Sequence, residues 1–182
     1  MSTVTAPSVT TWKIDPAHSS VEFSVRHLMI STVKGRFADV TGTVKTDDSD
    51  PTKGEVDVTI AVASIDTREA QRDAHLRSAD FFDADHVPTM TFHSTRVEGV
   101  KGNTFKLVGD LRIRGVSREV ALDVTAEGRG KDPWGGERAG FSAVTTIKRS
   151  DYGLTWNQIL ETGGVAVSDE IKITIDAELV KA

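Results

Sequence analysis

Ile171-Lys-Ile-Thr-Ile-Asp-Ala-Glu-Leu179 is the stretch that decides the fold, because apolar and polar residues alternate along it without a break. An alternation of period two is typical of a strand with one buried and one solvated face. The same period recurs in four earlier runs, which contain Val21 to Val25, Val56 to Val62, Phe105 to Ile113 and Val120 to Val124. The sequence therefore predicts an all-β protein built from half-buried strands.

Short turn-forming segments separate these runs, among them Asp47 to Pro51, Gly99 to Asn103 and Gly128 to Gly136. Short connections favour antiparallel neighbours, and closing a sheet on itself removes its exposed edges. Roughly eight or more such strands in one small domain indicate a sandwich or a closed up-and-down barrel. Alternation alone does not separate these two architectures.

Two segments break the alternation. From Asp66 to about Ser78 the residues favour a helix, with Asp66 and Glu69 as the expected capping pair and Asp73 and Arg77 as an expected ion pair. Its apolar stripe is small, so we expect a cover over the end or side of a barrel, followed by Phe81 and Phe82 pointing inward. The other segment, 151–164, holds large apolar residues and is expected either to pack over the core or to gate a cavity.

Length and composition limit the classes of protein. The 182 residues, with no cysteine and a formal net charge of −5, predict one domain without disulfides and argue against a nucleic-acid binder. We expect a flexible N-terminus over residues 1–9 and a single domain over 10–182. No secretory signal and no membrane-spanning apolar run is recognisable, so the chain is expected in the cytoplasm.

The residues that could carry chemistry form no standard site. Histidines and carboxylates between Asp73 and His86 fit neither zinc nor calcium spacing, and there is no Gly-x-Ser-x-Gly elbow or phosphate loop. We therefore expect no metal and no cofactor. His27 follows the strand that contains Val21 to Val25, where it either satisfies backbone groups at the strand end or contacts a ligand head group.

Several motifs occur in a familiar order along the chain. They are Trp12-Lys-Ile-Asp-Pro-Ala-His-Ser19, Val21-Glu-Phe-Ser-Val-Arg-His27, Gly35-Arg-Phe37, Ser64-Ile-Asp-Thr67, Asp73 to Asp83, Pro88 to Phe92, Gly109 to Gly115 and Arg149-Ser-Asp-Tyr-Gly153. In this order they resemble the YceI-like, polyisoprenoid-binding family. The resemblance implies a lipocalin-like, elongated antiparallel barrel of about eight strands with a helical insertion around 66–83. It also implies a long isoprenoid chain in an apolar tunnel, and often a homodimer. Many members carry a secretory signal, and we expect none in this chain.

The resulting hypothesis is a non-enzymatic carrier of a polyisoprenoid, a prenyl pyrophosphate or an isoprenoid quinone, with peripheral membrane contact during ligand exchange. The expected tunnel residues are apolar: Val21, Phe23, Val25, Val58, Ile60, Phe81, Phe82, Phe92, Phe141, Trp156 and Ile173. Arg26, His27 and Arg77 are the head-group candidates. Two alternatives stay open: an enzyme that uses His27 for acid–base chemistry in the same cavity, and a structural barrel packed solid with side chains.

Overall fold

The computed structural model describes residues 8–161 and 163–182, and eleven strands make up one antiparallel sheet. One α-helix, α1 (Ala70–Arg77), and four 3₁₀ turns, η1 (Pro16–His18), η2 (Pro51–Lys53), η3 (Val62–Ser64) and η4 (Arg149–Tyr152), connect them. The strands are β1 (Val9–Ile14), β2 (Ser20–His27), β3 (Ser31–Phe37), β4 (Val40–Asp47), β5 (Glu55–Ala61), β6 (Ile65–Asp66), β7 (Thr89–Lys101), β8 (Thr104–Ile113), β9 (Val116–Lys131), β10 (Glu137–Lys148) and β11 (Glu170–Lys181).

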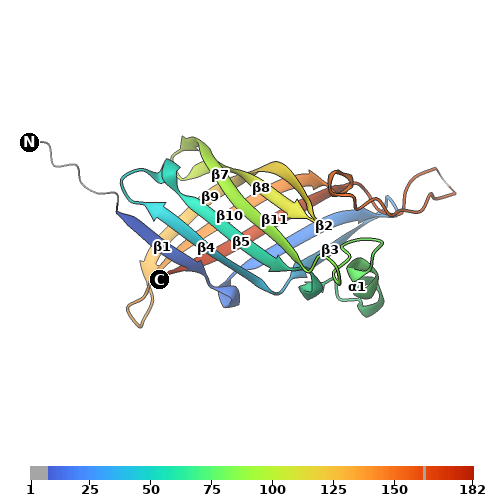
Figure 1. The fold of residues 1–182 in the computed structure, drawn as a ribbon, viewed down its shortest axis with the longest axis horizontal. Helices are drawn as coiled ribbons and strands as arrows, with labels where there is room; N and C mark the ends of the chain where they lie inside the picture. Colours follow the sequence, from blue (N-terminus) through green and yellow to red (C-terminus); the bar gives the residue numbers. More distant parts are fainter. Residues whose placement is uncertain (1–7, 162) are drawn as a thin grey trace, which may run out of the picture.

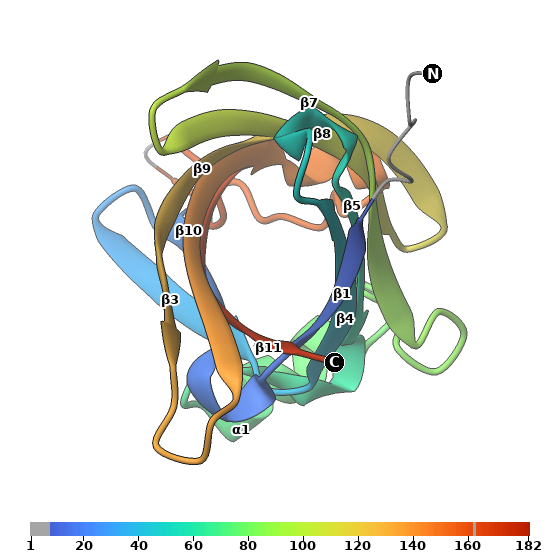
Figure 2. The same ribbon diagram turned by 90° about the vertical axis from the view of Figure 1, so that its left-hand side faces the viewer.

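Pairing between the first and last strands closes the sheet into a barrel. The order β1-β4-β5-β7-β8-β9-β10-β11 returns to β1 through pairs such as Trp12 with Lys181, which makes a ring of eight strands. The remaining strands β2, β3 and β6 extend the sheet from β11. The barrel is elongated (Figure 1), and its strands enclose the long axis when seen from the end that carries the C-terminus (Figure 2). The predicted elongated antiparallel barrel is confirmed, and closure separates it from a sandwich.

The alternating stretch of β11 supplies one inward row of the wall. Directly opposite residues in an antiparallel pair point to the same face. Ile173 lies opposite Thr145 of β10 and Phe23 of β2, while Ile175 lies opposite Ala143 and Val21. The period-two pattern therefore predicts correctly which residues of this strand face the interior.

Helix α1 lies at the end of the barrel opposite the N-terminal strand, as a cover (Figure 1). Its predicted capping pair is wrong. Asp66 belongs to β6, where its carboxylate accepts the Arg68 N–H at 2.9 Å, and Glu69 itself caps the helix by accepting the N–H groups of Gln71 and Arg72. The acid that comes first in the sequence is held by a tight turn, so the helix begins one turn later than expected.

The predicted ion pair on the helix is also wrong. Asp73 is buried and accepts hydrogen bonds from the backbone N–H and the hydroxyl of Thr67, at 2.9 and 2.5 Å. Arg77 donates instead to the carbonyls of Ala63 and Ile65. Both side chains tie the helix to the segment before it, which a sequence spacing of four does not reveal.

Three clusters of buried side chains follow the barrel axis. One at the α1 end contains Phe37, Ile65 and Tyr152, a second in the middle contains Phe92 and Leu122, and the third contains Trp12 and Leu179. Most of the N-terminus expected to be flexible, residues 1–7, lies outside the described residues, and Val9 already begins β1. In the described ranges no helix is both long and apolar enough to cross a membrane.

Candidate ligand-binding site

Part of the inward-facing wall is not fully packed, although the side chains of the middle cluster, such as Phe92 and Leu122, are buried. Six inward side chains lie on strands paired on both sides and are nevertheless only half-buried: Val21, Phe23, Val25, Val58, Ile60 and Ile173. In contrast, Val62 and Ile65 at the α1 end are 1% and 2% exposed. Strands β5 and β11 belong to the closed ring, where an inward side chain remains accessible mainly from the interior, while β2 extends the sheet beside β11. This pattern favours a hollow lumen with apolar walls over a barrel packed solid.

Two glycines let aromatic rings lie flat against the wall. A Cβ atom on Gly35 would lie 2.4 Å from Cζ of Phe23, and one on Gly109 would lie 2.6 Å from Cζ of Phe92. Both distances are well below the van der Waals separation of two non-bonded carbon atoms, which is about 3.5 Å or more. The absence of a side chain at these positions therefore keeps the two rings out of the lumen centre. Phe141 lies further along the wall, inward and half-buried, and contacts both neighbouring clusters.

Aromatic side chains close the α1 end. The rings of Phe81 and Trp156 lie 5.4 Å apart between centroids, and Phe82 makes an edge-to-face contact with Phe37 at 5.9 Å. His75 of α1 packs edge-on against Trp156 at 4.7 Å. We refer to Phe81, Phe82 and Trp156 as the aromatic cap. These three predicted tunnel residues lie together, at the end of the interior rather than along its wall.

Arg149 holds the segment that carries Trp156. Its guanidinium is buried and donates to four backbone carbonyls, those of Leu154, Trp156, Val167 and Ser168, at 2.7 to 3.1 Å. Burial lowers the pKa of this side chain. Five fixed donors on one planar group explain why an arginine can organise a loop from the inside. The first part of the segment 151–164 thus packs over the core through Tyr152 and Leu154.

Tyr152 is the residue of this end that sequence reasoning missed. The side chain is 1% exposed, and its hydroxyl has no hydrogen-bond partner among the described residues. Burial raises its pKa to about 12. It borders a cavity of about 480 Å³ that Arg114, Val116 and Trp156 also line. The available signal was its position in Arg149-Ser-Asp-Tyr-Gly153 as the one tyrosine of the chain.

The opposite end is closed by Trp12 of β1. The indole is 2% exposed and donates to the Thr46 hydroxyl at 3.1 Å. The guanidinium of Arg129 lies 5.1 Å from the ring centroid. A bulge between Gly140 and Phe141 shifts the register of β9 so that Arg129 lies opposite the inward-facing Ala139. A cation over an indole face is an attractive contact and closes this end with a polar rim.

The three head-group candidates do not converge. Arg26 is exposed and donates to the Thr32 hydroxyl and the Met29 carbonyl, at 3.0 and 3.3 Å. Arg77 is engaged with the two carbonyls that anchor α1. His27 is half-buried at the end of β2 and bridges to Val167, and its imidazole makes no hydrogen bond to a carboxylate among the described residues. Neither a shared head-group site nor an acid–base pair is assembled from them.

Comparison with known proteins gives the relationships of this chain. The YceI-like domain family matches residues 12–179. The chain belongs to the YceI-like family. It is 40% identical to a UPF0312 protein of Serratia proteamaculans, over 94% of this chain and 86% of the relative. It is also 40% identical to a UPF0312 protein of Staphylococcus aureus, over 93% of this chain and 97% of the relative.

Solved structures show the same fold as this YceI-like chain. Burkholderia cenocepacia BcnA superposes with a TM-score of 0.79 at 27% identity, covering 91% of this chain and 98% of BcnA. The Campylobacter jejuni YceI protein gives 0.74 at 36% identity, covering 86% and 90% of the two chains. A polyisoprenoid-binding domain from Saccharophagus degradans gives 0.70 at 14% identity, covering 95% and 99%, and is similar in fold.

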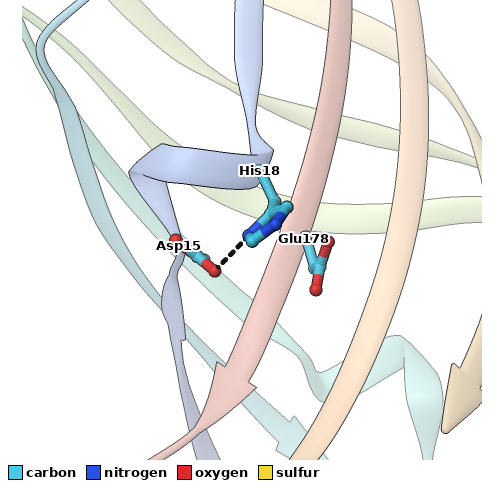
Figure 3. A group of neighbouring side chains, drawn as sticks. All are labelled: Asp15, His18 and Glu178. Atoms are coloured by element: carbon cyan, nitrogen blue, oxygen red, sulfur yellow. Dashed lines mark hydrogen bonds and ion pairs between the residues drawn. The ribbon is translucent and has the colours of Figure 1, made fainter. Parts of the chain in front are cut away.

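One group of possible metal ligands lies outside the barrel interior of this YceI-like chain. Asp15, His18 and Glu178 each place a ligand atom within 4.8 Å of the others (Figure 3). However, Arg138 donates to Asp15 and Glu178 at 2.7 and 2.9 Å, so both carboxylates already share a positively charged partner. Hydrogen bonds from His18 and Arg138 lower the pKa of Asp15 to about 2, and the same contact raises the pKa of His18. The contacts are those of an ion-pair network that fixes η1 to β10 and β11.

Proposed function

We propose that this protein binds a long apolar isoprenoid lipid in the barrel interior without transforming it. The candidate ligands are a polyisoprenoid, a prenyl pyrophosphate or an isoprenoid quinone. The observation that carries the proposal is the half-burial of inward apolar side chains of β5 and β11 in the closed ring, continued by those of β2, which extends the sheet beside β11. Membership of the YceI-like family supports it, as does the fold shared with a domain described as polyisoprenoid-binding.

The size and chemistry of the wall suit such a ligand. From Ile171 to Leu179 the inward row of β11 spans eight residue steps of about 3.3 Å, or about 26 Å along the strand. Each CH₂ that a ligand buries is worth about 0.8 kcal/mol, so fifteen such carbons supply about 12 kcal/mol before the costs of association and ordering. Apolar contact alone therefore provides the affinity that a carrier needs.

Extraction of bound lipid tests the proposal. We expect protein purified from a membrane-containing lysate to release an isoprenoid into organic solvent, detected by mass spectrometry. Phe23→Glu should lose the lipid because it places a charge in the lumen. Val144→Glu is the matched control, since Val144 is 41% exposed on the outer face of β10.

Two results would overturn the proposal. One is the repeated absence of isoprenoid above the level in a mock purification. The other is full retention of lipid by a folded Phe23→Glu variant. Residence in the cytoplasm and formation of a homodimer stay predictions, and mass analysis of the intact protein under native conditions reports the bound mass and the subunit number together.

A further inference from the structure

The turn between β2 and β3 places two large apolar residues in a strained backbone conformation. The Ile30 N–H donates to the His27 carbonyl at 3.1 Å, and the two residues enclosed, Leu28 and Met29, have φ angles of 52° and 64°. Hairpin turns of this left-handed kind normally contain Asn-Gly or Asp-Gly. Large side chains rarely adopt positive φ, because Cβ crowds the backbone. The chain therefore gives up conformational stability to hold leucine and methionine here.

These residues belong to an exposed apolar surface. Leu28, Met29 and Ile30 are 38%, 55% and 77% exposed, and Ile159 in the segment before β11 is 85% exposed. A Cβ atom on Gly164 would lie 3.1 Å from Cγ of Met29 and 3.8 Å from Cδ1 of Leu160, so the turn and this segment meet. We call Leu28, Met29, Ile30 and Ile159 the apolar tip. It lies at the same end of the barrel as α1 (Figure 1).

The hairpin behind the tip is basic, although the whole chain carries a net charge of −5. Between Phe23 and Phe37 there is no Asp or Glu, while Arg26, Lys34 and Arg36 are all exposed. The Arg36 guanidinium forms an ion pair with the Asp66 carboxylate at 3.7 Å. The charges of Arg26 and Lys34 are therefore the ones that dominate this surface. Arg26 is fixed directly behind the tip by its hydrogen bond to the Met29 carbonyl. The facing segment carries three exposed acids, Glu161, Asp169 and Glu170. Asp169 accepts hydrogen bonds from Ser150, which leaves Glu161 and Glu170 as the opposing charges.

We propose that the apolar tip inserts into the surface of a bilayer that contains anionic phospholipid, with Arg26 and Lys34 at the level of the head groups. Apolar side chains beyond a basic rim are the arrangement that peripheral proteins use to bind such surfaces. A second copy of this chain is the weaker occupant, since a symmetric contact through the tip would bring the two basic hairpins together. The biological purpose, exchange of an apolar ligand, rests on the proposed function, but the docking surface does not.

A variant that improves folding while removing the tip gives the sharpest test. Leu28→Asn/Met29→Gly installs the favoured turn residues, so the thermal midpoint of the protein should stay the same or rise. Binding of the full chain to vesicles of phosphatidylcholine mixed with phosphatidylglycerol, measured by flotation, should fall by at least about fivefold. Arg26→Gln/Lys34→Gln should remove most of the difference between these vesicles and vesicles of phosphatidylcholine alone.

The control variant lies at the other end of the barrel. Trp134 is 86% exposed in the turn between β9 and β10, and Trp134→Ser should leave vesicle binding unchanged. The proposal is overturned if the wild-type chain does not float with the anionic vesicles, if the turn variant binds as well as wild type, or if Trp134→Ser abolishes binding. Light scattering that shows a dimer lost in the turn variant, without vesicle binding, would assign the tip to a second copy instead. Solvent extraction of bound lipid is scored separately, so failure to dock and failure to carry lipid give different results.

Discussion

Truncating the same residue type in the lumen wall and in the packed end separates a hollow barrel from a solid one. Ile173 of β11 is inward and half-buried, while Ile65 of β6 is 2% exposed in the cluster at the α1 end. Substitution by alanine removes three carbons, worth about 2.4 kcal/mol when fully buried. A cavity term brings Ile65→Ala to about 4 kcal/mol. Ile173→Ala should lower the free energy of unfolding by only about 1 kcal/mol. The removed carbons are only half-buried, so about half of the 2.4 kcal/mol applies, and no new cavity forms in a hollow lumen.

Urea denaturation of the lipid-free protein measures both costs through the shift in midpoint at constant slope. Lys172→Ala, at an exposed position on the same strand as Ile173, reports the loss of strand propensity on β11 and is subtracted from the Ile173 value. Added isoprenoid should then increase the difference in unfolding free energy between wild type and Ile173→Ala, because the ligand stabilises wild type through a contact that the variant lacks. Costs that agree within about 1 kcal/mol for the two isoleucines would show a packed interior and refute the hollow lumen.

Three further outcomes follow from the structure. Tyr152→Phe should leave stability unchanged or raise it by about 1 kcal/mol in denaturant melts, because the buried hydroxyl has no partner among the described residues, and a clear loss would contradict this. Gly35→Ala should lower lipid recovery by mass spectrometry, because its Cβ would lie 2.4 Å from Phe23 Cζ and push that ring into the lumen; undiminished recovery would argue against it. His18→Gln should reduce the thermal midpoint only at acidic pH: the pKa of His18 is raised by Asp15, so its contribution is complete below the usual value of about 6.5 and is lost as pH rises through the folded-state pKa. A midpoint difference that persists at alkaline pH would contradict the ion-pair explanation.

The sequence was sufficient for the walls of the barrel because each wall residue is determined by its own strand. Inward positions such as Val21, Phe23 and Ile173 follow from period two, which is a local property of the chain. Closure of the barrel was not local. It depends on β1 pairing with β11, more than 160 residues away in the sequence, and the alternation is the same in a sandwich.

The ends of the barrel were less predictable, because their side chains act through tertiary hydrogen bonds. Arg149 donates to carbonyls up to 19 residues away, and no spacing rule anticipates such contacts. Likewise, Asp73 was expected to form an ion pair with Arg77 and is instead buried against Thr67. The bulge at Gly140 and Phe141 changes which face Arg129 occupies, so alternation read through this point gives the wrong side. The head-group candidates, chosen from position alone, stay predictions.

The wall and the apolar tip share one physical feature. At both, the chain forgoes stability that a common substitution would recover. A larger inward side chain at the half-buried Ile173 would bury more apolar surface, and Asn-Gly at 28–29 would relieve two left-handed residues. A chain gives up folding stability where function needs it to. In each place apolar side chains remain exposed that a lipid could cover. Under the two proposals, a prenyl chain would cover the lumen wall and a bilayer surface would cover the apolar tip. The two sites therefore fit one ligand chemistry, although they lie on different parts of the barrel.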